Sequence, residues 1–203
     1  MIAFGVMDYL VYGRASAGAG DEDTPQLDDA HWTYMDAHAG RMTARGPTLT
    51  PDRETWTGSL HVVDLPDATA AHAFAEDDPY HRAGLFRDHL VQRFDTLLGH
   101  TMWDVLRNDG DVPFLLLADD GPGLPAGSIP PARPPASVAG RLVLWGVLHP
   151  ADAQDLSGPS TGTAVALLAP DEAAARALVA AEPALLVGSA TWQLHAWEFG
   201  GRR

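Results

Sequence analysis

Residues 58–85 read GSLHVVDLPDATAAHAFAEDDPYHRAGL, and the organisation of the whole chain can be worked out from this stretch. Its apolar beginning predicts a buried strand, and the alanine-rich part after Pro66-Asp67 predicts a helix. The helix is expected to end at Asp78-Pro79, because proline disfavours a helical residue before it. The stretch therefore predicts one strand followed by one helix.

A second copy of this pattern lies at residues 162–189, GTAVALLAPDEAAARALVAAEPALLVGS. Five residues recur at a constant offset along the chain: Gly58, Pro66, Asp67, Pro79 and Gly84 return as Gly162, Pro170, Asp171, Pro183 and Gly188. A repeat of this kind indicates that one structural unit is used twice. We therefore expect the 203 residues to form two domains, at 1–108 and 109–203.

The composition excludes several classes of protein. Hydrophobic residues make up 46% of the chain, which is enough for a packed core. The chain has 27 Asp and Glu residues and 13 Lys and Arg residues. Its formal charge of -14 would repel the phosphate backbone of a nucleic acid, so nucleic-acid binding is not expected. The chain has no cysteine, so disulfides and thiolate metal sites are excluded. No long apolar run or secretion signal is evident, which predicts a cytoplasmic protein that does not enter membranes.

The first half predicts a strand, a helix, two strands, a helix and a strand. An apolar run at the N-terminus predicts the first strand, and Asp28 and Asp29 are expected to begin a helix that Gly46 ends. Trp32, Met35, Ala39 and Met42 would form its apolar stripe. Strands are expected at residues 2–12, 57–65 and 86–97, and helices at residues 30–46 and 67–75. The turn-rich residues 47–56 are expected to form a hairpin with the strand at 57–65. This order is typical of an α+β, ferredoxin-like unit, with two helices on one face of an antiparallel sheet.

The second half predicts a damaged copy of the same unit. Strands are expected at residues 113–118, 141–148 and 191–199, and a helix at residues 171–181. A loop rich in glycine and proline at residues 119–135 takes the place of most of the first helix.

Several motifs in residues 1–97 together resemble the YciI-like family, which is built on the YCII domain. They are His31-Trp-Thr-Tyr34-Met35, Gly46-Pro47, Thr57-Gly58-Ser59-Leu60, Asp78-Pro79-Tyr80 and Ala83-Gly84-Leu85. The resemblance implies a fold of the dimeric α/β barrel superfamily, in which two copies usually associate through their sheets. In this chain the degenerate second half would act as a built-in partner, giving an intramolecular pseudo-dimer that could pair again as a homodimer.

The resemblance also implies a catalytic His–Asp pair, here His31 and Asp78, facing a small pocket. A carboxylate that accepts from one imidazole nitrogen leaves the other nitrogen free to move a proton near neutral pH. A gapless comparison would instead put Asp29 in the place of the histidine. The alternative is a purely structural role, in which Asp78 caps the backbone before Pro79 and His31 lies on a helix surface.

Three further side chains are candidates for binding a substrate: Tyr34, Ser59 and Tyr80. The second half has Glu182 in place of Asp78 and Ala184 in place of Tyr80, so its own pair is lost. Three tryptophans, Trp145, Trp192 and Trp197, could form a wall between the halves or simply belong to the core.

No cofactor or metal is expected. The nine histidines form no HxH or HExxH pattern, and no glycine-rich GxGxxG loop follows a strand. The leading hypothesis is a cofactor-independent lyase or isomerase that acts on a small cyclic or carbonyl-bearing compound. The alternative is a non-catalytic protein that binds a small ligand or serves as a scaffold.

Overall fold

The computed structural model describes residues 7–19, 24–118, 131, 133–156, 158, 160–187 and 191–201. The strands of this part of the chain are β1 (Asp8–Ala15), β2 (Met42–Leu49), β3 (Trp56–Asp64), β4 (Phe86–Thr96), β5 (Val112–Ala118), β6 (Leu142–Pro150), β7 (Gly162–Ala169) and β8 (Gln193–Trp197). Its α-helices are α1 (Pro25–His38), α2 (Ala68–Asp77), α3 (Pro79–Arg82) and α4 (Glu172–Ala181). Short 3-10 turns are η2 (Ala39–Arg41), η3 (Met102–Asp104), η4 (Ala139–Arg141) and η5 (Pro183–Leu186). These elements confirm the expected α+β class.

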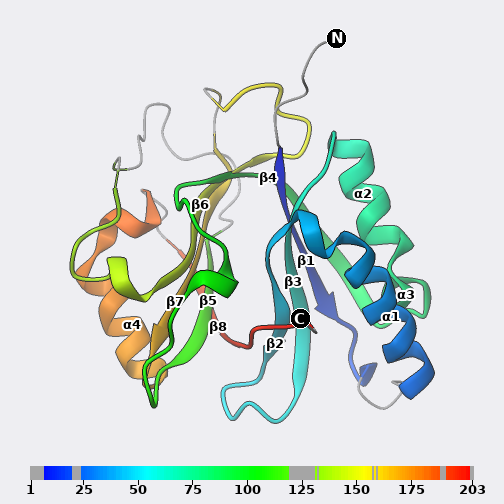
Figure 1. The fold of residues 1–203 in the computed structure, drawn as a ribbon, viewed down its shortest axis with the longest axis horizontal. Coiled ribbons are helices and arrows are strands. Elements are labelled where there is room, and N and C mark those ends of the chain that lie inside the picture. The colour runs from blue at the N-terminus through cyan, green and yellow to red at the C-terminus, as the bar shows by residue number, and fades with distance from the viewer. Residues whose placement is uncertain are drawn as a thin grey trace.

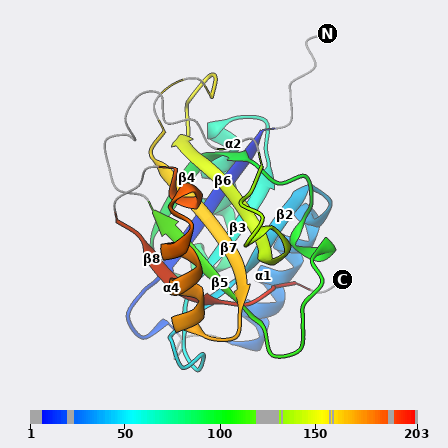
Figure 2. The same ribbon diagram turned by 90° about the vertical axis from the view of Figure 1, so that its left-hand side faces the viewer.

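The strands close into an antiparallel barrel in the order β1-β3-β2-β8-β5-β7-β6-β4. Strands of the first half are neighbours in the order β4-β1-β3-β2, and those of the second half follow as β8-β5-β7-β6. The two sets meet where β2 pairs with β8 and where β4 pairs with β6. Helices α1, α2 and α3 lie outside β1 to β4 (Figure 1), and α4 crosses the outer face of the second set of strands (Figure 2).

Side chains alternate between the barrel interior and the layer beneath the helices. On β3, Leu60 and Val62 belong to the interior cluster, whereas Val63 packs with Met35 and Phe74 under the helices. This alternation is the period of two expected for a strand. One face of β3 is therefore committed to the barrel core, and its other face is left to build contacts with α1 and α2.

The two repeated helices begin in the same way, as the repeat predicts. The carboxylates of Asp67 and Asp171 accept the backbone N–H of Ala70 and Ala174, each at 2.8 Å. An acceptor at this position satisfies a donor that the first helical turn leaves open. Gly188, the last residue of the repeat, lies outside the described residues.

The expected helix at residues 30–46 is wrong at both ends. Helix α1 begins at Pro25, after Thr24, whose hydroxyl accepts the N–H of Leu27, and it ends at His38. The chain then enters β2 at Met42, because residues 42–49 find hydrogen-bond partners in β3, and this tertiary pairing outweighs a local helical pattern.

The apolar stripe proposed for that helix is wrong as well. Met35 is buried, but Trp32 is 44% exposed and Met42 belongs to β2. Of the other predictions, the hairpin between β2 and β3 and the strands near residues 57–65, 86–97 and 113–118 are confirmed, as is the helix near 171–181. The closing strand is shorter than residues 191–199, since β8 spans Gln193–Trp197. The first strand is described only from residue 7, and most of the loop at residues 119–135 lies outside the described residues.

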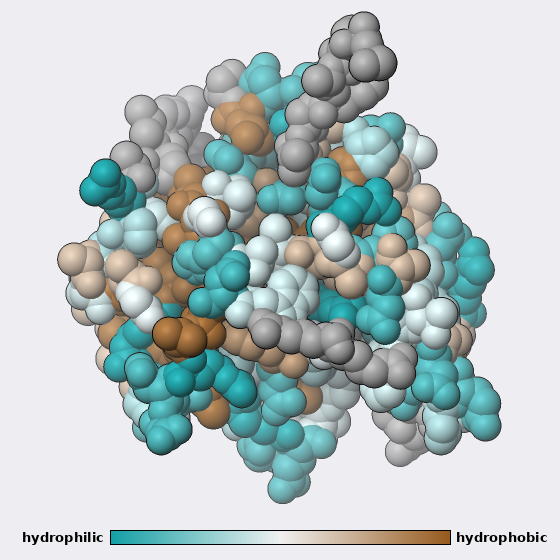
Figure 3. Space-filling view, viewed as in Figure 1, coloured by the Kyte–Doolittle hydropathy of each residue, from teal (hydrophilic) through white to brown (hydrophobic). Residues whose placement is uncertain are grey.

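Hydrophilic residues are interspersed with apolar ones on the face shown in Figure 3. Among the helices of the described residues, none is long and apolar enough to cross a membrane.

Replacing Gly46 with alanine should destabilise the protein. Gly46 has a φ of 154°, and a Cβ there would lie 1.9 Å from the carbonyl oxygen of Glu198. We expect the free energy of unfolding to fall by about 3 kcal/mol, as the backbone of β2 and the C-terminal segment are forced apart. Gly40→Ala is the matched control, since a Cβ there meets nothing within 4 Å. Urea unfolding curves with equal midpoints for the two variants would contradict this expectation.

Candidate active site

His31 faces inward from α1. It and Met35, one turn further on, are the buried residues of this helix, and His31 is 6% exposed. Residues four apart lie on the same face of a helix, so both side chains point toward the sheet. His31 is thus buried on the sheet-facing side of α1 and does not lie on the exposed surface of the helix.

Asp78 sits at the break between two helices. It ends α2 and begins α3, and Pro79 follows it as the first residue of α3. Its Oδ1 atom accepts the backbone N–H of Tyr80 at 2.9 Å and lies 2.7 Å from Nδ1 of His31. Asp78 is only 3% exposed. The carboxylate therefore performs both roles that the sequence left as alternatives, since it caps the helix and also pairs with the histidine.

Tyr80 holds the imidazole of His31 in place. The two rings are stacked with centroids 4.0 Å apart and planes 3° from parallel. The Tyr80 hydroxyl donates to the carboxylate of Asp28, which comes from the first turn of α1. With Nδ1 directed at Asp78 and one face covered by Tyr80, Nε2 is the ring nitrogen left for chemistry.

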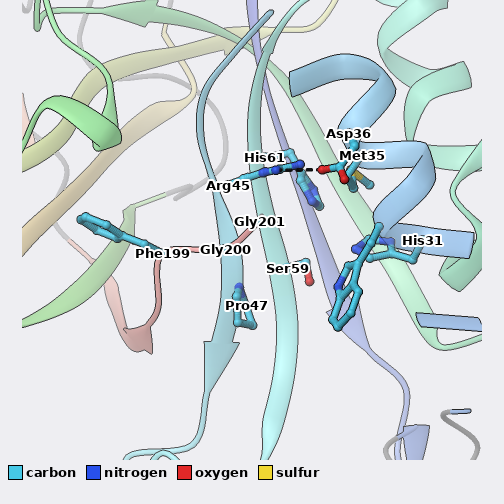
Figure 4. Close-up of a pocket in the computed structure, with 12 residues that line it drawn as sticks. His31, Met35, Asp36, Arg45, Pro47, Ser59, His61, Phe199, Gly200 and Gly201 are labelled. Atoms are coloured by element: carbon cyan, nitrogen blue, oxygen red, sulfur yellow. Dashed lines mark hydrogen bonds and ion pairs between the residues drawn. The ribbon is translucent and has the colours of Figure 1, made fainter. Parts of the chain in front are cut away.

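A cavity of about 340 Å³ lies between α1 and strands β2 and β3 (Figure 4). Three parts of the chain line it: His31, Trp32, Met35 and Asp36 from α1, Arg45, Gly46, Pro47, Ser59 and His61 from the two strands, and Phe199, Gly200 and Gly201 from the C-terminal segment.

Strand register brings the sheet residues of the cavity together. Arg45 pairs with His61 and Pro47 pairs with Ser59 across β2 and β3. Because side chains alternate along a strand, these four share the face beneath α1. The guanidinium of Arg45 donates to Asp36 on the helix at 3.0 Å, so the same ion pair spans the cavity from sheet to helix.

His61 remains neutral under ordinary conditions. Burial, with a smaller contribution from the neighbouring charge of His31, lowers the pKa of His61 from 6.5 to about 3. The rings of His31 and His61 meet edge to face, with centroids 6.1 Å apart. The cavity therefore holds two histidines, of which one is paired with a carboxylate and the other is kept uncharged.

The second half of the chain supplies one wall of the cavity. The N–H groups of Glu198 and Gly200 donate to the carbonyls of Pro47 and Arg45, at 3.1 and 2.8 Å. A Cβ at Gly200 would lie 2.6 Å from the Cα of Gly46, so the two backbones approach more closely than side chains allow. The segment after β8 is thereby held against β2.

The structure brings together some of the predicted site residues and separates others. His31 and Asp78 are paired, and Ser59 lines the cavity, where it accepts from the indole of Trp56 at 3.4 Å. Tyr34 and Tyr80 do not line this cavity, and the Tyr34 hydroxyl donates to the carbonyl of Phe74. A substrate-binding role for the two tyrosines stays a prediction.

The alternative placement at Asp29 finds no counterpart in the geometry, because Asp29 is exposed and His31 pairs with Asp78. The three tryptophans are also absent from the cavity lining. Trp197 is buried in the barrel interior, and Trp145 is buried in the core of the second half, where its indole donates to Leu185.

Sequence reasoning missed Arg45, His61, Asp36 and the segment at residues 199–201. His61 could have been found, since it stands two residues after Ser59 and must share its face of the strand. The contribution of residues 199–201 depends on how the barrel closes, and no local pattern indicates it. Within the described residues, no three His, Asp or Glu side chains are arranged to hold a metal ion.

The fold and site define an α+β barrel protein with a buried His–Asp pair beside a small cavity. Residues 7–95 match the model of the YCII-related domain, which confirms the expected resemblance. The match lies within the first half of the chain. No curated protein matches the sequence.

Three solved structures resemble the chain over different lengths. The 5-chloro-2-hydroxyhydroquinone dehydrochlorinase of Burkholderia phenoliruptrix, in complex with 2,5-dihydroxybenzoquinone, is 28% identical over 44% of this chain and 94% of its own, with a TM-score of 0.40. A candidate monooxygenase of Lactobacillus acidophilus is 7% identical over 95% of this chain and 92% of its own, with a TM-score of 0.48. Another, from Fusobacterium nucleatum, is 11% identical over 98% and 94%, with a TM-score of 0.46. At these TM-scores, none of the three defines the reaction of this chain.

His61 should make the protein less stable as the pH falls. The pKa of His61 in the folded protein lies below its ordinary value of 6.5. Below pH 6.5, His61 is therefore protonated in the unfolded chain and stays neutral in the folded protein. Stability is then lost as the pH falls from 6.5 toward 3, with a slope of up to about 1.4 kcal/mol per pH unit.

Replacing His61 with glutamine should flatten this slope. The measurement is urea unfolding of the wild type and His61→Gln at several pH values below 6.5. His72→Gln is the control, because His72 is exposed on α2. All three proteins have the same carboxylates, so parallel pH profiles for wild type and His61→Gln would refute the expectation.

Proposed function

We propose that this protein is a cofactor-independent lyase or isomerase in which His31 transfers a proton and Asp78 orients it. The observation that carries the proposal is the 2.7 Å hydrogen bond between Nδ1 of His31 and Oδ1 of Asp78, with both side chains buried and His31 lining a cavity. A histidine that is oriented by a carboxylate and borders a cavity is positioned as a general acid or base requires.

The pair suits the abstraction of a proton. An ionised Asp78 accepts from Nδ1–H, which fixes the tautomer and leaves a lone pair on Nε2. When Nε2 takes a proton from a substrate, the imidazolium that forms is stabilised by the carboxylate beside it. The stacked ring of Tyr80 keeps the imidazole from rotating, so the base is oriented before the substrate arrives.

The size and lining of the cavity favour a small, ring-shaped or carbonyl-bearing substrate. A volume of about 340 Å³ is near the lower end for small-molecule sites. Met35, Pro47 and Phe199 offer apolar surface to a ring, and Ser59, His61 and Arg45 offer polar groups to its oxygens.

The second half acts in this proposal as a partner built into the same chain. Each half supplies four neighbouring strands in the same pattern, with its first strand between its third and fourth, which supports two ferredoxin-like units joined as a pseudo-dimer. The second unit has Glu182 in the place of Asp78 and contributes the wall at residues 199–201 to the site of the first.

Replacing His31 with asparagine should abolish proton transfer and leave the fold intact. The wild type would be screened in D₂O with cyclic ketones and hydroxylated quinones, and incorporation of deuterium would be followed by proton NMR. For any compound whose exchange the wild type accelerates, His31→Asn should reduce the rate by about 100-fold or more. His72→Asn is the matched control on the exposed side of α2. Unchanged exchange in His31→Asn would rule out this base, and no acceleration by the wild type would favour the non-catalytic, ligand-binding alternative.

The tautomer of His31 gives a test that needs no substrate. In the neutral ring, nitrogen NMR should show the proton on Nδ1, because that atom faces the Asp78 carboxylate at 2.7 Å. Asp78→Ala should remove this preference. A proton found on Nε2 in the wild type would contradict the proposed orientation of the base.

A further inference from the structure

The sheet side of the cavity carries two buried nitrogen donors that face the base on the helix side. Arg45 is 3% exposed and His61 is 5% exposed, and they are cross-strand partners in the register of β2 and β3. His31 approaches from α1, opposite these strands (Figure 4). A ligand in the cavity would therefore lie beside both a proton acceptor and a pair of hydrogen-bond donors.

The guanidinium of Arg45 is held in one orientation by groups from two parts of the chain. Its Nη2 donates to Asp36 of α1 at 3.0 Å. A Cβ at Gly201 would lie 2.1 Å from that guanidinium, so the group packs directly against the C-terminal backbone. The backbone N–H of Arg45 also donates to the sulfur of Met102, at 3.2 Å. A donor that is already immobilised loses little freedom when a ligand binds.

The charge of Arg45 is shielded less by water than the charge of its partner. The side chain of Arg45 is 4% exposed, whereas that of Asp36 is 39% exposed. Charges interact more strongly where water is excluded, so on the buried side of this ion pair the positive charge prevails. This local field is opposite in sign to the formal charge of -14 of the chain as a whole.

His61 is suited to donate a hydrogen bond without giving up its proton. Because burial keeps its ring neutral, it is a weak acid and a neutral donor, as in enzymes where an uncharged imidazole polarises a carbonyl. Its ring meets that of His31 with centroids 6.1 Å apart, so both histidines can reach one small molecule.

We propose that Arg45 and His61 form an oxyanion site, and that the substrate class is carbonyl compounds that bind as, or react through, an enolate or a phenolate. This inference rests on the proposed role of His31 as a base and names the substrates of the same cavity. The reaction that generates the charge is proton abstraction beside a carbonyl. The C–H bond breaks and its proton moves to Nε2 of His31. The electron pair of that bond becomes a C=C bond, and the carbonyl becomes C–O⁻ facing the donors.

The competing account is that Arg45 and Asp36 form an ion pair that only ties α1 to β2. The two accounts differ in the effect of removing each partner. A purely structural pair loses its contribution whichever side is removed. An oxyanion site requires Arg45 and is expected to keep its preference for anions without Asp36.

The test compares two isomeric rings by calorimetric titration at pH 7. 1,3-Cyclohexanedione is an enolate anion at neutral pH, and 1,4-cyclohexanedione is a neutral molecule of the same size. The wild type should bind the 1,3-isomer at least about tenfold more tightly, which is the ratio expected for one additional charged hydrogen bond. If the wild type binds the two isomers with equal affinity, the inference is wrong, and no variant is needed to show it.

Variants then assign the preference to residues. Arg45→Met keeps the length of the side chain and should remove the preference, and Asp36→Asn should preserve it. His61→Phe keeps a buried ring without a donor and should reduce the preference by about threefold or more. The structural account holds instead if Arg45→Met keeps the preference or if Asp36→Asn loses it to the same extent. If Arg45→Met does not fold, Arg45→Lys replaces it. The site is then supported if Asp36→Asn keeps the preference for the 1,3-isomer and His61→Phe reduces it. The reverse result in these two variants overturns the site.

His31→Asn separates this inference from the proposed function. It should bind 1,3-cyclohexanedione within about threefold of the wild type, because the enolate has no proton left to give. If the wild type exchanges protons but shows no preference for the anion, the oxyanion site is wrong and the base remains. If the preference is present and proton exchange is absent for every compound, the site binds anions and the enzymatic proposal fails.

Discussion

Strand β2 is hydrogen-bonded along both of its edges, and this double pairing is the constraint on which the site depends. One edge is paired with β3 and the other with β8 and the segment after it. The pairing closes the barrel between the two halves, and it also sets Arg45 opposite His61 and lays Gly200 against Gly46. A strand in the centre of a sheet cannot shift its register without turning every side chain to the other face. The positions of the β2 residues that line the cavity are therefore fixed by the same strand register that closes the barrel.

The His–Asp pair depends on a different device, the break between α2 and α3. Pro79 has no N–H to continue α2, and the carboxylate of Asp78 accepts the backbone N–H of Tyr80 in the next helix. A side chain that caps a helix is confined to a small region of space. That confinement places Oδ1 at a buried position beside α1, where His31 reaches it. One local rule of chain geometry thus supplies both the fold and the orientation of the base.

Several features of the site could be predicted from the sequence. The repeat located the strand–helix units, the two aspartate caps and the proline after Asp78, because caps and proline breaks follow from residues a few positions apart. The family resemblance supplied His31, Asp78 and Ser59. Arg45 was missed because residues 42–46 were assigned to a helix, in which Arg45 and Gly46 would have had different neighbours. That error came from extending an apolar stripe through Met42, a residue that is buried in the structure by strand pairing.

The sequence by itself determined that the two repeated helices begin after Asp67 and Asp171, that a break follows at Asp78-Pro79, and that the strands of the repeat are buried, since each of these depends on neighbouring residues. The tertiary structure alone decided that residues 42–49 are a strand, that Arg45 and His61 share a face with Ser59, and that residues 199–201 close the cavity of the first half. The physical reason is that strand pairing joins residues far apart in the sequence, as where Thr48 of β2 pairs with Trp197 of β8, and no local pattern encodes such a pairing.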